Sequence, residues 1–241
     1  MNLRHAILPL ALALSLPAVA DAARGFEVRD MAYMDRHSSP TLSPDGRVLV
    51  FAKRVVDKAT HKSSTSLWTR NLLTRDMRPP SRLTPEGWNV NSPSFSADGK
   101  TVYFMSGKSG SMQLYSLPIA GGEPTRLTDY ALDVDAYKFS PDGTHVALAF
   151  AVFPDCKADL TCTKKKLDDV DALKTTGKVF DRMFIRHWDT WNDGRLNRVF
   201  AAKLGGAGML KTATLLSGDI AGDIPSKPFG DLSDFAWSPD G

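Results

Sequence analysis

The sequence Ser43-Pro44-Asp45-Gly46 returns three more times in this 241-residue chain, once with alanine in place of proline. The further copies begin at Ser96, Ser140 and Ser238. The glycines of the first three copies are 53 and 44 residues apart, and the last gap is 98 residues. Proline and glycine at these positions favour a tight turn, and a recurrence at this spacing is typical of repeat architectures. The chain is therefore predicted to be an array of similar units.

Strand-like segments recur in phase with this turn. An apolar run without strict alternation follows each of the first three copies, at residues 47–52, 100–105 and 145–150. Such runs suit strands that are buried on both faces. Further short strands are expected before each turn and after each run, which gives four strands in about 45 residues, as in a β-propeller blade.

We therefore predict an all-β fold, a partial β-propeller of about three four-stranded blades plus the start of a fourth. The fourth blade would open with Phe235-Ala236-Trp237. A β-sandwich also has short strands and frequent turns, but it does not require one turn sequence at a long period. The repeat favours the propeller.

The first 22 residues are predicted to be a secretory signal peptide, so that the propeller domain comprises residues 23–241. Arg4 and His5 precede an apolar run from Ala6 to Leu16, and small residues follow it. This order is typical of a cleaved signal, here with Ala20 or Ala22 as the last residue removed. Eleven apolar residues are too few to span a bilayer of roughly 30 Å. A periplasmic or secreted protein without a membrane span is expected.

The composition argues against a nucleic-acid partner. The chain has 30 lysines and arginines against 27 acidic residues, a net charge of +3, and these charges are scattered. A nucleic-acid surface requires clustered basic residues. Hydrophobic residues make up 42% of the chain, which is sufficient for a packed core.

The repeat is interrupted over residues 154–178, which we interpret as an insertion in the third blade; a hidden, imperfect blade is the alternative. The segment contains both cysteines of the chain, Cys156 and Cys162. In an oxidising compartment a disulfide is the favoured interpretation, because the close Cys and His spacings of a metal site are missing. Residues 167–173 could form about two helical turns with one apolar face.

After this insertion a strand is expected over residues 179–191, returning through Asn192-Asp193-Gly194 to a second strand at 196–204, and these are predicted to be outer strands of blade three. Within the first of these lies the candidate contact site for a peptide substrate or a protein partner: Arg186, Trp188, Asp189 and Trp191. Two aromatic rings, an arginine and a carboxylate so close together are typical of contact surfaces. Aromatic residues are also common in ordinary strands, so packing is the alternative.

No catalytic residue, metal site or cofactor is predicted. The chain contains no Gly-x-Ser-x-Gly, and Gly107-Lys108-Ser109 lacks the earlier glycine of a phosphate-binding loop. Asp133, Asp135 and Asp142 do not have the spacing of a calcium loop. The serines of the repeated turn are explained by hydrogen bonds to the local backbone.

The sequence resembles the N-terminal propeller of serine peptidases of the prolyl oligopeptidase family (S9), which includes dipeptidyl-peptidases and acylaminoacyl-peptidases. The repeated turns carry the resemblance, together with the following segments: Val28–Met31, Pro40–Gly46, Leu67-Trp68, Arg82–Thr84, and Phe180–Phe200 around His187-Trp188-Asp189. It covers nearly the whole mature chain. The blade motif is shared with TolB-like periplasmic propellers.

In this family the propeller precedes an α/β-hydrolase domain that carries the catalytic serine, aspartate and histidine. The resemblance therefore implies that the chain is truncated before that domain and is inactive alone. It also implies that the propeller gates access of peptides to the hydrolase domain and contacts the N-terminal side of the substrate. The alternative is a TolB-like, non-enzymatic module that binds another protein.

Overall fold

The computed structural model describes residues 24–73, 79–180, 183, 185–188, 190–204 and 209–241. The signal peptide expected over residues 1–22 lies outside this part. The chain divides into two compact units, Met1–Ala32 and Tyr33–Gly241. The short helix α1 (Val28–Tyr33) begins in the first unit, where the Asp30 carboxylate accepts a hydrogen bond from the Glu27 amide and pairs with Arg24.

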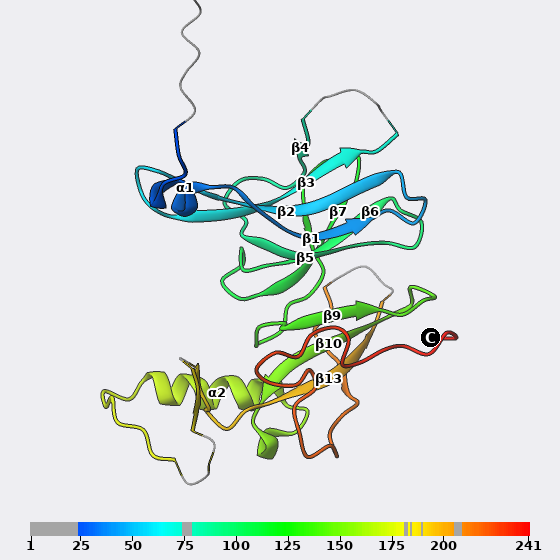
Figure 1. The fold of residues 1–241 in the computed structure, drawn as a ribbon. Helices are drawn as coiled ribbons and strands as arrows, with labels where there is room; N and C mark the ends of the chain where they lie inside the picture. Colours follow the sequence, from blue (N-terminus) through cyan, green and yellow to red (C-terminus); the bar gives the residue numbers. More distant parts are fainter. Residues whose placement is uncertain (1–23, 74–78, 181–182, 184, 189, 205–208) are drawn as a thin grey trace, which may run out of the picture. The chain divides into compact units, whose positions relative to one another are not determined.

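The second unit contains three four-stranded antiparallel sheets, labelled in part in Figure 1, and each has its strands in chain order. Blade one consists of β1 (Arg36–Leu42), β2 (Val48–Val56), β3 (Ser63–Asn71) and β4 (Ser81–Arg82). Blade two consists of β5 (Val90–Phe95), β6 (Thr101–Ser106), β7 (Gln113–Pro118) and β8 (Thr125–Arg126). Blade three consists of β9 (Ala136–Phe139), β10 (His145–Val152), β13 (Leu196–Lys203) and β14 (Thr214–Leu215). The predicted all-β fold with propeller-type blades is confirmed.

The Ser-Pro-Asp-Gly motif forms the turn between the first two strands of each blade. In the first copy the Gly46 amide donates to the Ser43 carbonyl at 2.8 Å, and Gly46 has a φ of +70°. The Ser43 hydroxyl donates to Asp45 at 2.6 Å and accepts from the Val48 amide at 2.9 Å. The copies at Ser96 and Ser140 repeat these bonds. Each turn therefore supplies its own hydrogen-bond partners, and the serines need no catalytic explanation.

A second repeated feature is a hydrogen bond between a side-chain hydroxyl and the third strand of each blade. Thr84 and Thr128, which end the two Arg-Leu-Thr segments, each accept a hydrogen bond from a buried amide of the third strand at 2.9 Å. Ser217 does the same for the Val199 amide in blade three, also at 2.9 Å. In each blade the fourth strand ends after two residues, and a side-chain hydroxyl then accepts the next hydrogen bond from the third strand.

The first strands of blades one and two share a distortion. Ser39 and Ser92 have φ angles of 49° and 50°, and the strand register shifts at both places. Pro40 and Pro93 follow these serines directly. Both prolines lie on strands at the edge of a sheet, where the missing amide hydrogen does not break a ladder.

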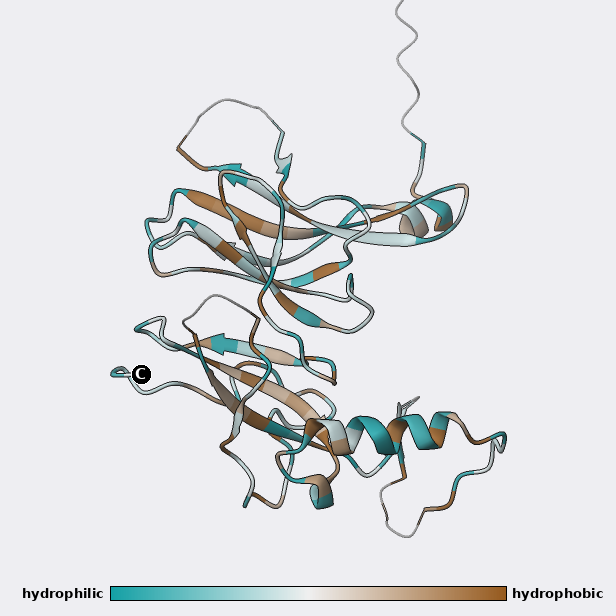
Figure 2. Ribbon diagram, turned by 180° about the vertical axis from the view of Figure 1, so that it is seen from behind, coloured by the Kyte–Doolittle hydropathy of each residue, from teal (hydrophilic) through white to brown (hydrophobic). Residues whose placement is uncertain are grey.

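Two hydrophobic clusters fill the space between the blades. The first joins blades one and two around Val50, Leu67 and Phe104. The second joins blades two and three around Leu114, Leu148 and Phe150. In Figure 2 the hydrophobic residues are concentrated on the strands. The continuous apolar runs noted in the sequence are thus buried on both faces of their sheets, as the pattern predicts.

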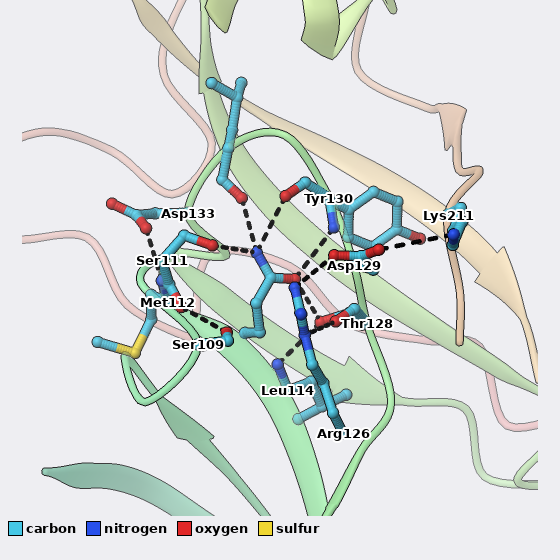
Figure 3. A network of polar contacts seen from close by, with 12 residues as sticks. Ser109, Ser111, Met112, Leu114, Arg126, Thr128, Asp129, Tyr130, Asp133 and Lys211 are labelled. Atoms are coloured by element: carbon cyan, nitrogen blue, oxygen red, sulfur yellow. Dashed lines mark hydrogen bonds and ion pairs between the residues drawn. The ribbon is translucent and has the colours of Figure 1, made fainter. Parts of the chain in front are cut away.

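Gln113 is a fully buried polar side chain at the start of β7, and all its hydrogen-bonding atoms are used. Its amide nitrogen donates to the Ser111 hydroxyl and to the carbonyls of Tyr130 and Leu132, at 3.0–3.2 Å. Its oxygen accepts from the Thr128 hydroxyl at 2.7 Å and from the Tyr130 amide at 3.1 Å. Figure 3 shows this network. It links β7 of blade two to Tyr130 and Leu132, which lie in the connection between blades two and three.

The insertion in blade three is longer than expected, because it occupies the whole connection from β10 to β13. It contains a 3₁₀ turn (Pro154–Cys156), the helix α2 (Leu160–Asp171) and two short strands, β11 (Arg186–His187) and β12 (Thr190–Trp191). The helix begins seven residues earlier than predicted, because the Asp159 carboxylate caps it by accepting from the Cys162 amide. A disulfide joins Cys156 and Cys162.

The helix differs from its prediction in extent, because α2 ends at Asp171 and Leu173 lies beyond it. Of the three apolar residues expected on one face, Leu167 packs on the core, while Val170 and Leu173 are exposed. The assignment of the strand expected over 179–191 to blade three is wrong, because the described residues of that segment form only the short pair β11–β12. β13 pairs instead with β10, which precedes the insertion.

The residues expected to open a fourth blade, Phe235-Ala236-Trp237, do not form a strand. The segment nevertheless lies beside β9, where the Trp237 indole donates to the Lys138 carbonyl at 2.8 Å. Lys138 donates in turn to the carbonyls of Leu232 and Phe235. The fourth copy of the repeated turn is present, with the Gly241 amide donating to the Ser238 carbonyl at 3.1 Å.

Candidate functional site

The structure brings together only some of the predicted contact residues. Arg186 and Trp191 are opposite each other in the β11–β12 pair, and the Arg186 guanidinium lies 5.3 Å from the centre of the Trp191 ring. Trp188 is in the turn between them, 74% exposed, and its ring contacts Phe229 rather than Trp191. Asp189 lies outside the described residues. Arg186 and Trp191 thus form one cluster, and Trp188 is separate from it.

Trp191 is at the centre of a group of cations and rings. Phe180 stacks on it with ring centres 5.7 Å apart, and the Lys178 ammonium lies 5.8 Å from the ring centre. Cations near an aromatic face are attracted by its quadrupole. These contacts fix the orientation of a tryptophan that is still 46% exposed.

Trp191 also lines a pocket of about 540 Å³, which we call the Trp191 pocket. Its walls come from the end of the insertion, from the strand ends of blade three and from the connection after blade three. The lining residues are Asp135, Ala151, Thr190, Trp191, Asn192, Asp193, Arg195, Leu196, Asn197, Asp223, Lys227 and Pro228. A concave site of this size with several convergent polar groups suits a small ligand or a peptide side chain.

Two of the three carboxylates in this pocket have a cationic partner. The Arg195 guanidinium lies 2.7 Å from Asp193, and the Lys227 ammonium lies 3.3 Å from Asp223. Asp223 also accepts a hydrogen bond from the Asn197 amide at 2.7 Å. These contacts hold the pocket wall in one arrangement, because each joins segments separated along the chain or closes a turn.

Asp135 differs from the other two carboxylates, because within the described part of the chain no cation lies within ion-pairing distance of it. Desolvation raises the pKa of its carboxyl, and the neighbouring charge of Asp133 raises it further. Arg195 and Lys227 oppose this increase from a longer distance. Asp135 is therefore the acidic group of the pocket that is best placed to pair with a cation from outside.

Sequence reasoning missed Asp135, Arg195 and Lys227. Asp135 directly precedes β9, and the other two lie on connections whose folding back onto blade three is set by tertiary contacts. Only the turn Asn192-Asp193-Gly194 gave a local signal at this place in the sequence.

Neither a metal centre nor a membrane helix is found in the part of the chain that the structure describes. Over the described ranges, no group of three His, Cys, Asp or Glu side chains is arranged to hold a metal ion. No helix among the same residues is long and apolar enough to cross a membrane.

Comparison with known proteins identifies the family. Residues 29–153, about half of the chain, match the model of the dipeptidyl peptidase IV (DPP IV) N-terminal region. The chain belongs to this family. The match covers blades one and two and the strands β9 and β10 of blade three, so that this N-terminal region includes the first three repeated turns.

Individual members of known protein families are also similar to this DPP IV N-terminal region, some of them beyond residues 29–153. Dipeptidyl-peptidase 5 of Porphyromonas gingivalis is 33% identical over 208 residues, which cover 86% of this chain and 29% of that protein. The TolB protein of Francisella tularensis subsp. mediasiatica is 42% identical over 62 residues, which are 26% of this chain and 14% of that protein. The chain spans about three tenths of the length of the dipeptidyl-peptidases that it matches.

Among solved structures, the acylaminoacyl peptidase of Pyrococcus horikoshii is similar with a TM-score of 0.52. The sequences are 12% identical, and the match covers 76% of this chain and 25% of that one. This likeness supports the propeller-type fold of the chain.

Proposed function

We propose that this chain is the propeller portion of an exported dipeptidyl-peptidase-like serine peptidase, and that it gates the access of peptides to a hydrolase domain. The observation that carries this proposal is the match of residues 29–153 to the DPP IV N-terminal region. The relatives that match over most of this chain are peptidases more than three times as long as the matched segment. No catalytic residue is assigned within the chain itself.

The Trp191 pocket is the place where we expect the propeller to contact a peptide. Asp135 supplies a carboxylate without an ion-pair partner among the described residues, and Trp191 supplies an aromatic ring to the same pocket. Together these groups suit an ammonium or guanidinium group, since a carboxylate and an aromatic ring both attract cations. Arg186 positions the Trp191 ring, and Trp188 is an exposed ring in the turn of the same hairpin. Asp189 remains a contact residue predicted from the sequence alone.

Release of dipeptides by the full-length protein that carries this chain tests the proposal. With fluorogenic dipeptide substrates, Asp135→Asn is expected to raise KM about tenfold, the equivalent of about 1.4 kcal/mol of binding, with little change in kcat. Because the pKa of Asp135 is raised, substrate binding should strengthen as the pH rises through that pKa, and the asparagine variant should lose this dependence. Asp171→Asn, the same change at the exposed end of α2, is the control.

The outcomes of this assay are distinct. No release from any dipeptide substrate would refute the peptidase proposal. Equal KM values for Asp135→Asn and Asp171→Asn would refute the role of the Trp191 pocket while leaving the peptidase proposal intact.

Export makes a separate prediction about the N-terminus. After expression in a Gram-negative host, the mature protein is expected to begin at Asp21 or Ala23, because cleavage should follow Ala20 or Ala22. Sequencing the N-terminus of protein from the periplasmic fraction measures this. Placing two aspartates within the run Ala6–Leu16 should keep the protein in the cytoplasm at full length. An uncleaved periplasmic protein, or export of the aspartate variant, would contradict the signal assignment.

A TolB-like binding module is the second candidate, favoured by the 62-residue similarity to the Francisella protein. Such a module would bind another protein without cleaving peptides. A full-length protein without a Gly-x-Ser-x-Gly segment after this region, and without labelling by a fluorophosphonate probe, would favour it over the peptidase.

A further inference from the structure

The connection from α2 to the β11–β12 hairpin is exposed along its first half. Residues 172–179, which we call the processing loop, are all exposed, and residues 173–180 belong to no helix or strand. At the two ends of this run, Leu173 is 61% and Val179 is 99% exposed. We propose that the processing loop is a site of proteolytic modification, at which a peptidase that cleaves after lysine cuts the folded protein between Lys174 and Thr175.

The backbone of the processing loop is accessible as well as its side chains. The amide of Leu173 still donates to the Val170 carbonyl at 3.1 Å, at the end of the helix. From residue 174 to residue 179, no backbone hydrogen bond is made to another described residue. A side chain added at Gly177 would meet no atom within 4 Å. Because a peptidase binds its substrate in an extended form, this segment can enter an active site without unfolding of the blades.

Lys174 is the lysine of the insertion that is best placed for such a cut. Its side chain is exposed and makes no hydrogen bond or ion pair with a described residue. Lys164 and Lys165 lie within α2, where each is ion-paired and the backbone is held by helical hydrogen bonds. The ammonium of Lys178 lies over the Trp191 ring, 5.8 Å from its centre. The bond after Lys174 is therefore expected to be cut first.

The reaction is the hydrolysis of one amide bond, and it consumes one water molecule. The Lys174 carbonyl carbon gains the hydroxyl group, and the Thr175 nitrogen gains the hydrogen. At neutral pH the products are a carboxylate on Lys174 and an ammonium group on Thr175. The peptidase is the catalyst, and no further reactant is needed.

The two products are expected to stay together, because each side of the cut is anchored separately. The strands β10 and β13, which flank the insertion, pair along their whole length. Before the cut, Leu160 and Leu167 pack against the hydrophobic cluster of blades two and three. After the cut, Phe180 stacks on Trp191 with ring centres 5.7 Å apart. The processed protein is thus a two-chain form of the same fold.

Limited digestion of the full-length protein that carries this chain provides the test, with a lysine-specific endopeptidase in native buffer as the probe. The earliest new N-terminus, read by mass spectrometry, is expected to be Thr175. The disulfide between Cys156 and Cys162 lies entirely before the cut, so that the two products should separate on a denaturing gel without reductant. In native buffer they should elute together from a size-exclusion column.

Lys174→Gln is expected to slow the first cut about tenfold, because cleavage must then use the bond after Lys178 or a lysine within regular structure. The exposed position of Lys174 makes a loss of folding an unexpected result, and circular dichroism of the variant checks this.

Lys58→Gln is the matched control. Lys58 is also exposed, in the turn between β2 and β3, but the backbone of that turn is held by hydrogen bonds. The Asp57 carboxylate accepts from the amides of Ala59 and Thr60 at 3.1 and 2.6 Å. This substitution should therefore leave the digestion unchanged.

A first cut after any other lysine would overturn the proposal. So would equal rates for the native protein and Lys174→Gln, equal slowing by Lys58→Gln, or products that elute separately in native buffer. The measurement requires neither a substrate nor activity of the protein itself, so its outcome is independent of the proposed function.

Discussion

Replacing Gln113 with leucine is expected to lower the free energy of unfolding by about 4 kcal/mol. The leucine would fill the space, but the carbonyls of Tyr130 and Leu132, the Tyr130 amide and the Thr128 hydroxyl would lose their shared partner. Each buried polar group left unsatisfied costs about 1–3 kcal/mol, and water entering the site would recover only part of the total. Urea denaturation followed by circular dichroism measures the change.

Ser111→Ala is the control for this prediction, because it removes one partner of Gln113 at a half-buried position. A loss of no more than about 1 kcal/mol is expected for it. If Gln113→Leu were as stable as the native chain, the network in Figure 3 would contribute nothing beyond the packing of its carbon atoms.

The second large effect is expected for Phe150→Ala, at about 3–5 kcal/mol of lost stability. Phe150 is fully buried on β10, and its ring makes T-shaped contacts with Tyr130 and Phe200, with ring centres 5.0 and 5.3 Å apart. The alanine would leave a cavity in the cluster that joins blades two and three. The same denaturation experiment measures the loss.

Leu173→Ala provides the comparison for this core substitution, since Leu173 is 61% exposed just after α2. Its effect should remain within about 0.5 kcal/mol. A loss for Phe150→Ala as small as that would mean that the contact between blades two and three contributes little to stability.

The repeated turns made the blades predictable because every determinant of a turn is local. Ser43, Asp45 and Gly46 satisfy one another within six residues, so the sequence alone identifies the turn and the strands on either side. The pairing of β10 with β13 across an insertion of more than 40 residues is not local. For that reason the strand expected over 179–191 was assigned to the wrong place.

The candidate site was only partly predictable for the same reason. Trp191 and Arg186 were identified because they are close in sequence, and the hairpin keeps them together. Asp135 and Lys227 reach the Trp191 pocket from segments more than 30 residues away from Trp191 along the chain. Their role depends on tertiary contacts, such as the bond from Lys227 to the Arg195 carbonyl, that no local pattern encodes.

The distorted first strands of blades one and two determine how another chain can meet these sheets. An edge strand with a regular row of amides can capture an extended peptide or a second copy of itself by strand addition. At Pro40 and Pro93 one donor is missing from that row, and the left-handed serine before each proline puts its neighbours out of register. A polypeptide that passes along these edges cannot be held by a continuous backbone ladder. Side-chain contacts must then supply part of the binding energy, and because such contacts depend on the bound sequence, these edges favour sequence-selective over non-selective binding.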